Sequence, residues 1–155
     1  MKEGFTEVLA VLDKSAQAEK TAGATVAAYN DLLAGLKKAD AVWTTVTFGA
    51  DAETVYDRAR VKDVKKLVKK DFAAGGRAAL FDTVGKAVDG LGVTLSKTAE
   101  EERPSKVIVL IGTAGIDNAS KKYSLDEIKA KIDHQRQVYS WEFIFAGADV
   151  SAFKG

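Results

Sequence analysis

The sequence contains no cysteine, a single histidine and a single proline, and its charges nearly cancel: 23 basic side chains stand against 22 acidic ones, for a formal charge of +1. Without cysteine, the chain has no disulfides, no thiolate metal site and no cysteine nucleophile. A chain so close to neutrality produces no global field that attracts nucleic acid or an anionic membrane. We therefore expect neither of these as a partner.

Long hydrophobic runs are also missing. No segment reaches the roughly 18 uninterrupted apolar residues that a membrane-spanning helix needs. The first apolar run is interrupted by Glu7 and closed by Asp13, which is typical of a strand rather than a signal peptide. We expect a soluble, cytoplasmic monomer. Because 155 residues with 46% hydrophobic content suit one core, we also expect a single domain over residues 1–155.

The chain alternates between strand-like and helix-like segments. Runs of β-branched and apolar residues predict strands, and apolar residues three or four positions apart predict helices. The predicted strands cover residues 5–12, 42–48, 54–59, 106–112 and 141–146, and the predicted helices cover residues 16–38, 61–70, 80–95 and 124–139. In the last helix, Ser124 is expected to be the N-cap and Glu127 its capping-box partner.

This alternation predicts an α/β fold: a Rossmann-like doubly wound sheet of about five strands in the order 3-2-1-4-5, with strand 3 antiparallel and helices on both faces. The nearly unbroken apolar run KVIVLIG at 106–112 is typical of a central parallel strand covered on both faces. In such sheets, ligands bind beyond the carboxyl ends of the strands where the winding reverses. Here that point lies between the strands that end near Asp13 and Gly112.

Three segments are expected to meet at this point: VLAVLDKSAQA at 8–18, GGRAALFD at 75–82 and KVIVLIGTAGIDNAS at 106–120. Together they resemble a von Willebrand factor A-type domain, closest to the bacterial and phage branch of that family, and the resemblance covers nearly the whole chain. It implies a noncatalytic interaction module that holds protein partners through a divalent cation.

The resemblance also implies where the cation ligands should be. Asp13 and Ser15 match the first two positions of the family's Asp-x-Ser-x-Ser loop, but Gln17 stands in place of the second serine. Ala78 occupies the position of the family's threonine, and Ala114 that of its second aspartate. Mg²⁺ and Mn²⁺ prefer six hard oxygen ligands, and alanine side chains provide none. We therefore expect no metal and no cofactor at these remnant loops.

An alternative stays open, in which Mg²⁺ or Mn²⁺ is still held by Asp13, Ser15 and the Gln17 carbonyl, with Asp117 swinging inward. Without a cation, Asp13 is expected to accept hydrogen bonds from the Ser15 hydroxyl and from loop amides.

Two basic residues flank the same mouth. Lys14 and Arg77 are either solvated loop residues or contacts for an acidic partner or a small anion.

Catalysis finds little support. The only histidine, His134, falls inside the last predicted helix, and Ser15 has no base to activate it. The GTAG sequence at 112–115 lacks the glycine spacing of a dinucleotide loop and the lysine of a phosphate loop. We expect a protein that is not an enzyme.

Two functional hypotheses remain. The first is a metal-free structural or protein-interaction module with an unidentified protein partner. It is either a natural inactive relative or a domain redesigned as a scaffold without a selected ligand, since the departures concentrate in the loops and Ala73-Ala74 stands where relatives often carry proline. The second is an adhesion module that binds protein through Mg²⁺ or Mn²⁺.

Overall fold

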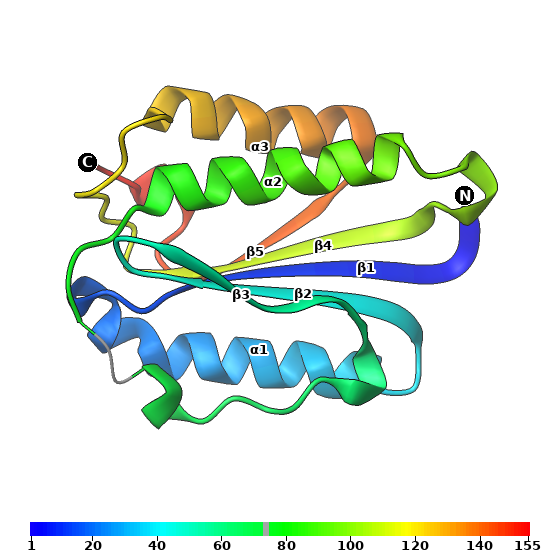
Figure 1. Cartoon of the computed structure of the whole chain (residues 1–155), viewed down its shortest axis with the longest axis horizontal. Coiled ribbons are helices and arrows are strands. Elements are labelled where there is room, and N and C mark those ends of the chain that lie inside the picture. The colour runs from blue at the N-terminus through cyan, green and yellow to red at the C-terminus, as the bar shows by residue number, and fades with distance from the viewer. Residues whose placement is uncertain (73–74) are drawn as a thin grey trace.

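The computed structural model describes residues 1–72 and 75–155, so Ala73-Ala74 lies outside the described residues. Within these ranges a central sheet is covered by helices on both faces (Figure 1). The strands are β1 (Lys2–Asp13), β2 (Asp40–Phe48), β3 (Ala52–Arg60), β4 (Pro104–Thr113) and β5 (Glu142–Gly147). The α-helices are α1 (Ala22–Leu36), α2 (Leu80–Ser96) and α3 (Leu125–Tyr139). Short 3₁₀ turns are η1 (Ala16–Thr21), η2 (Val61–Asp63), η3 (Lys69–Phe72), η4 (Glu100–Glu102) and η5 (Val150–Ala152).

The predicted fold class and strand order are confirmed. The sheet runs β3-β2-β1-β4-β5, and only β3 is antiparallel to its neighbour. The middle position belongs to β1, while β4, which the sequence placed at the centre, lies between β1 and β5. Both strands are nonetheless buried on two faces, which explains why both read as continuous apolar runs.

Two cores lie on either side of the sheet. The alternation of side chains along β1 sends Leu9 and Val11 toward α2 and α3, and sends Val8 and Leu12 toward α1. Figure 1 shows α2 and α3 side by side on one face and α1 on the other. Among the residues that the structure describes, no helix is long and apolar enough to cross a bilayer.

The capping box predicted for α3 is present. The Ser124 hydroxyl accepts a hydrogen bond from the Glu127 amide at 3.2 Å, and the Glu127 carboxylate accepts one from the Ser124 amide at 3.0 Å. The helix predicted over 16–38 instead begins as the 3₁₀ turn η1, and α1 follows only from Ala22. At that junction the Thr21 hydroxyl donates to the Ala18 carbonyl at 3.1 Å, a local bond that competes with α-helical pairing.

The helix predicted over 61–70 is wrong. After the single turn η2, the backbone is extended at Val64, and regular structure returns only with η3. Side chains from neighbouring elements explain the difference, because they bond the backbone of this segment. The Lys37 ammonium donates to the carbonyls of Val61 and Val64 at 3.3 and 2.7 Å, and Asn30 bonds both polar groups of Leu67. The apolar spacing did indicate which residues are buried, since Val61 and Val64 pack in the core on the α1 side of the sheet.

Candidate functional site

The structure brings the three segments of the carboxyl edge together through direct hydrogen bonds. The Thr113 hydroxyl at the end of β4 donates to Asp13 at the end of β1, at 2.7 Å. The Ala16 amide donates to the Gly76 carbonyl at 3.0 Å. The Ala78 amide donates to the Asn118 side-chain oxygen at 2.7 Å, which joins the second loop to the third. The edge is therefore a connected set of loops at the reversal point of the sheet.

The Asp13 carboxylate is 2% exposed, and both of its oxygens are engaged by the protein. One oxygen accepts from the Ser15 amide at 2.8 Å, and the other accepts from the Thr113 hydroxyl. The Thr113 oxygen in turn accepts from the Gly115 amide at 3.0 Å. The bond expected from the Ser15 hydroxyl to Asp13 is not made: the backbone amide of Ser15 and the neighbouring strand supply the donors instead.

Two other polar atoms of the first loop are left over. The Ser15 hydroxyl oxygen and the Gln17 carbonyl oxygen are buried without a hydrogen-bond partner among the described residues. Buried polar atoms are ordinarily satisfied by protein, water or an ion. These two oxygens are thus the atoms of this edge with unused capacity for a water molecule or a cation.

The two alanines of the remnant site differ in their surroundings. Ala78 is fully buried, and its carbonyl accepts from the amides of Asn118 and Ala119 at 2.9 and 3.1 Å. Ala114 is half-buried and lines a cavity of about 550 Å³ between η1 and the ends of β4 and β5. The polar residues on this cavity's wall are Gln17, Glu19, Lys20 and Thr21.

Asp117 does not join Asp13. One of its carboxylate oxygens accepts from the Phe81 amide at 3.1 Å and from the Ser120 hydroxyl, so the side chain caps the first turn of α2. A carboxylate at a helix N-terminus is favoured by the helix dipole. Within residues 1–72 and 75–155, no three His, Cys, Asp or Glu side chains come together in a way that could hold a metal ion.

The two flanking basic residues have different roles. Lys14 is half-buried, and its amide donates to the Phe48 carbonyl at 2.7 Å. Arg77 is exposed, and its guanidinium donates to the Asn118 carbonyl, which fixes the second loop to the third. Neither forms an ion pair with another described residue.

Sequence reasoning missed Thr113 and Asn118, which hold this edge together. Thr113 closes the apolar run of β4, and a hydroxyl at the end of a buried strand is a signal that could have been used. Asn118 forms hydrogen bonds to Ala78 through both its side chain and its backbone. No residue spacing in the sequence predicts that contact.

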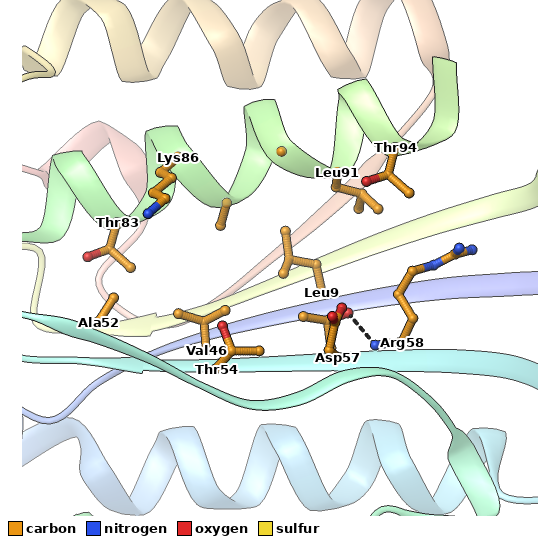
Figure 2. A pocket seen from close by; sticks show the side chains of 13 residues that line it. Leu9, Val46, Ala52, Thr54, Asp57, Arg58, Thr83, Lys86, Leu91 and Thr94 are labelled. Atoms are coloured by element: carbon orange, nitrogen blue, oxygen red, sulfur yellow. Dashed lines mark hydrogen bonds between the residues drawn. The ribbon is translucent and has the colours of Figure 1, made fainter. Parts of the chain in front are cut away.

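A second cavity, of about 330 Å³, lies between α2 and the strands β1 to β3 (Figure 2). Its apolar wall includes Leu9, Val46 and Leu91. Lys86 stands on the helix side near one end of the cavity, and Asp57 and Arg58 stand on the strand side near the other. Because both signs of charge are present with apolar surface, the walls do not favour one class of ligand.

An ion pair between the buried Glu7 and the partly exposed Arg58 lies beside this second cavity. Glu7 is fully buried, and Arg58 donates to its two oxygens from Nη2 at 2.8 Å and from Nε at 3.0 Å. Burial raises the pKa of the Glu7 carboxyl in spite of the opposing effect of Arg58. The bond to Glu7 in turn raises the pKa of Arg58.

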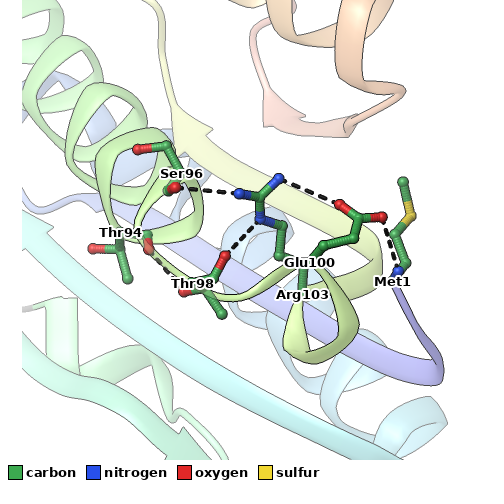
Figure 3. A network of polar contacts seen from close by, with 6 residues as sticks. All are labelled: Met1, Thr94, Ser96, Thr98, Glu100 and Arg103. Carbon is green, nitrogen blue, oxygen red and sulfur yellow. Dashed lines mark hydrogen bonds and ion pairs between the residues drawn. The ribbon is translucent and has the colours of Figure 1, made fainter.

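A polar network at the opposite edge of the sheet is structural (Figure 3). Arg103 donates to the Thr98 carbonyl at 2.8 Å and to the Ser96 carbonyl at 3.2 Å, which satisfies acceptors at the end of α2. Glu100 pairs with Arg103 at 3.4 Å and with the Met1 ammonium at 3.1 Å. The charges of Arg103, Glu100 and the Met1 ammonium are therefore paired within the protein, without a ligand.

His134 and the two tryptophans of the sequence lie in packed or exposed positions away from the carboxyl edge. His134 is exposed on α3, where its ring meets Tyr139 edge to face with centroids 5.7 Å apart. Trp43 is fully buried in the core on the α1 side, and Trp141 is buried in the core under α3.

Comparison with known proteins yields no matching family model and no matching curated relative. Solved structures do resemble this fold. An aerotolerance-related membrane protein from Bacteroides fragilis, with multiple mutations to serines, aligns with a TM-score of 0.52 and 15% identity over 90% of this chain and 66% of that chain. The pilus adhesin SpaC from Lactobacillus rhamnosus GG aligns with a TM-score of 0.52 and 12% identity over 76% of this chain and 15% of that one.

Proximal thread matrix protein 1 from the mussel byssus aligns with a TM-score of 0.51 and 15% identity over 92% of this chain and 35% of that chain. This chain therefore spans less than two thirds of each of the three. At such identities the likeness concerns the fold alone.

Proposed function

We propose that this protein is a noncatalytic A-type module that acts as a structural or protein-binding unit without a metal ion. The observation that carries the proposal is the state of Asp13. Its two oxygens are engaged by the Ser15 amide and the Thr113 hydroxyl, so the one carboxylate retained from the family's site is satisfied by the protein itself.

The charges and the missing ligands support the same proposal. Ala78 and Ala114 contribute no oxygen from their side chains, and the acid at Asp117 is used to cap α2. A hard divalent cation at this edge would depend on one carboxylate and a few neutral oxygens, and would remain mostly hydrated. Both the natural inactive relative and the redesigned scaffold are forms of this proposal.

We also propose that the protein has no catalytic activity. Ser15 lies near Asp13, and among the described residues its hydroxyl has no hydrogen-bonded base. His134 packs on Tyr139 and does not face that loop.

A second candidate function, protein binding through Mg²⁺ or Mn²⁺, is favoured by one specific observation. The oxygens of Ser15 and Gln17 are buried without partners, and together with Asp13 they form the residual ligand set of the alternative. Binding there would use the remaining lone pairs of the Asp13 carboxylate, whose two oxygens each accept one hydrogen bond.

The experiment that tests the proposal restores the missing ligands. The triple variant Gln17→Ser, Ala78→Thr, Ala114→Asp is titrated with Mg²⁺ beside the unmodified protein by isothermal calorimetry. We expect binding heat for the variant and none for the unmodified chain, because only the variant has the oxygen set that the resemblance implies. Heat of binding in the unmodified chain would favour the second candidate, and a silent triple variant would show that these loops do not correspond to the family's cation loops.

A further inference from the structure

Five lysines are concentrated in the segment between β3 and α2. This segment, which we call the basic strap, is residues 62–70 with the sequence KDVKKLVKK, and Asp63 is its only acid. The whole chain has a formal charge of +1. The strap therefore concentrates positive charge on one part of a protein that is otherwise acidic in sum.

The strap is fastened along α1 and does not form a helix. Asn30 donates to the Leu67 carbonyl at 2.9 Å and accepts from the Leu67 amide at 2.8 Å, much as a neighbouring strand would. Lys37 bonds the carbonyl of Val64, and the Tyr56 hydroxyl accepts from the Lys65 amide at 3.2 Å. Figure 1 shows this green segment following α1 on the side away from the sheet. These bonds use the backbone of the strap, and the side chains of Val64 and Leu67 pack on the α1 side of the core, which leaves the lysines to solvent.

The lysine side chains of the strap form no ion pair with the described residues, Asp63 of the strap included. All five lysines are exposed. Elsewhere in the chain, Lys2, Lys106 and Lys131 do pair with carboxylates, at 3.3, 3.2 and 3.0 Å. Five ammonium groups held along nine residues reinforce one another's positive field, and neighbouring groups repel one another.

We propose that the basic strap is a docking surface for an acidic segment of a partner protein, a run of aspartates and glutamates that lies along residues 62–70. Charge complementarity carries the proposal, because an acidic segment would relieve the repulsion among ammonium groups that the fold already holds in place. Ordering of the strap by Asn30 and Lys37 precedes binding, which lowers the entropic cost of association. The proposal rests on the proposed function and names the kind of partner that a metal-free module would hold.

Two other polyanions fit these observations less well. The strap has no aromatic residue between Lys62 and Lys70 on which a nucleic-acid base could stack. Its only exposed large apolar side chain among those positions is Val68, at 47% exposure, which gives little apolar surface to bury in a lipid headgroup layer. Duplex DNA and anionic vesicles therefore serve as competing outcomes of the test.

The test measures binding of a fluorescein-labelled oligoglutamate peptide to the full chain by fluorescence anisotropy. Binding is measured at low salt and again at about 0.3 M salt, where the Debye length is roughly half its value at about 0.1 M. The triple reversal K65E/K66E/K69E is expected to weaken binding by about tenfold or more, since each exchange turns an attraction into a repulsion. The control K97E/K121E/K154E changes exposed lysines elsewhere and shifts the net charge by the same amount. Its affinity should stay within about twofold of the unmodified protein.

Equal losses in the two variants would overturn the proposal, because they would show that net charge alone decides. So would the absence of peptide binding at low salt, or tighter binding of anionic vesicles or duplex DNA than of the peptide. Thermal unfolding checks that each variant is folded, and amide shifts of residues 62–70 in NMR titrations of the unmodified protein locate the contact without any substitution. Failure here leaves the metal titration of the restored variant unaffected, so the two proposals are tested separately.

Discussion

Glu7 and Arg58 are 51 residues apart in the chain and form a two-pronged ion pair across β2. Glu7 has no exposed surface in its side chain, whereas that of Arg58 is 35% exposed. The backbone of Arg58 has a φ of 48°, in the left-handed region that non-glycine residues seldom occupy, and its amide donates to the Thr44 hydroxyl at 3.1 Å. The irregular pairing of β2 and β3 near Thr45 thus aims the guanidinium at the buried acid.

Replacing Arg58 by methionine should destabilise the protein strongly. Removing one partner leaves a buried carboxylate uncompensated, which typically costs about 3 to 5 kcal/mol. Chemical denaturation at pH 7 measures this loss. The matched control is Arg60→Met, which removes an exposed pair with Asp40, and there we expect a change of about 1 kcal/mol or less.

The loss of stability in Arg58→Met should also depend on pH. Burial raises the pKa of Glu7, so between the unperturbed value of 4.5 and the raised value the native state holds more protons than the unfolded chain. Stability from this group is therefore present at acid pH and is lost as the pH rises through the native pKa. Since removal of Arg58 raises that pKa further, the loss of unfolding free energy in Arg58→Met should become smaller as the pH falls. A deficit that is constant with pH would contradict a charged Glu7 at neutrality.

Two glycines of α2 should respond in opposite directions to alanine. A Cβ on Gly85 would lie 2.6 Å from the Tyr123 ring, so Gly85→Ala should cost about 1 to 3 kcal/mol through overpacking. A Cβ on Gly90 meets nothing within 4 Å, so Gly90→Ala should stabilise the helix by about 0.5 to 1 kcal/mol. Thermal unfolding of the pair tests the packing of Tyr123 on α2, and the same sign for both would refute it.

Asp82 should stabilise the connection between α2 and α3. Its carboxylate accepts from the amides of Lys121, Lys122 and Tyr123 at 2.8 to 2.9 Å. Desolvation pushes the pKa of Asp82 upward, but the three amides outweigh it and hold the pKa below the ordinary 3.8. We expect Asp82→Ala to cost about 1 to 3 kcal/mol at neutral pH, since three donors lose their acceptor.

The pH dependence of the Asp82 contribution has the opposite sign to that of Glu7. A lowered pKa gives stability that is present above 3.8 and is lost as the pH falls through the native value. The difference between the unmodified protein and Asp82→Ala should therefore narrow in strong acid. Asp126→Ala, which changes an exposed acid in the first turn of α3, is a control expected to lose less than about 1 kcal/mol.

Asn30 should hold the basic strap against α1. Asn30→Ala removes both bonds to Leu67, and we expect a loss of about 1 to 3 kcal/mol together with faster amide exchange at Leu67. Hydrogen exchange measured by NMR checks both the site and the size of the effect. Asn30→Asp keeps the acceptor for the Leu67 amide and loses the donor, so its exchange rate should fall between those of Asn30→Ala and the unmodified protein.

The sequence was a good guide to whatever depends on local pattern. Runs of β-branched and apolar residues located the strands, the Ser124 and Glu127 pair located the start of α3, and the order of the elements led to the sheet topology. Segment 61–70 shows the limit of that approach. Its apolar spacing suits a helix, but the side chains of Asn30 and Lys37, which come from another element, capture its backbone.

The sequence predicted where in the fold the candidate site lies, but not which contacts its residues make. The resemblance brought the three loops to one edge, and hydrogen bonds do join them there. The hydroxyl of Thr113 at the end of β4 is visible in the sequence, but its bond to Asp13, 100 residues away, depends on the register of β1 against β4. Unsatisfied oxygens such as that of Gln17 are likewise a product of packing that no motif encodes.

The measurement that tests the central claim most directly is thermal unfolding of the unmodified protein in EDTA, in Mg²⁺ and in Mn²⁺, in parallel. A ligand that binds only the native state adds to the free energy of unfolding, by about 2.7 kcal/mol when its concentration is a hundred times its Kd. The unfolding midpoint must then rise. A module whose Asp13 is already satisfied by Ser15 and Thr113 should give three identical midpoints. A clear rise with either ion would contradict the metal-free account and would favour the alternative in which Asp13, Ser15 and Gln17 hold a cation.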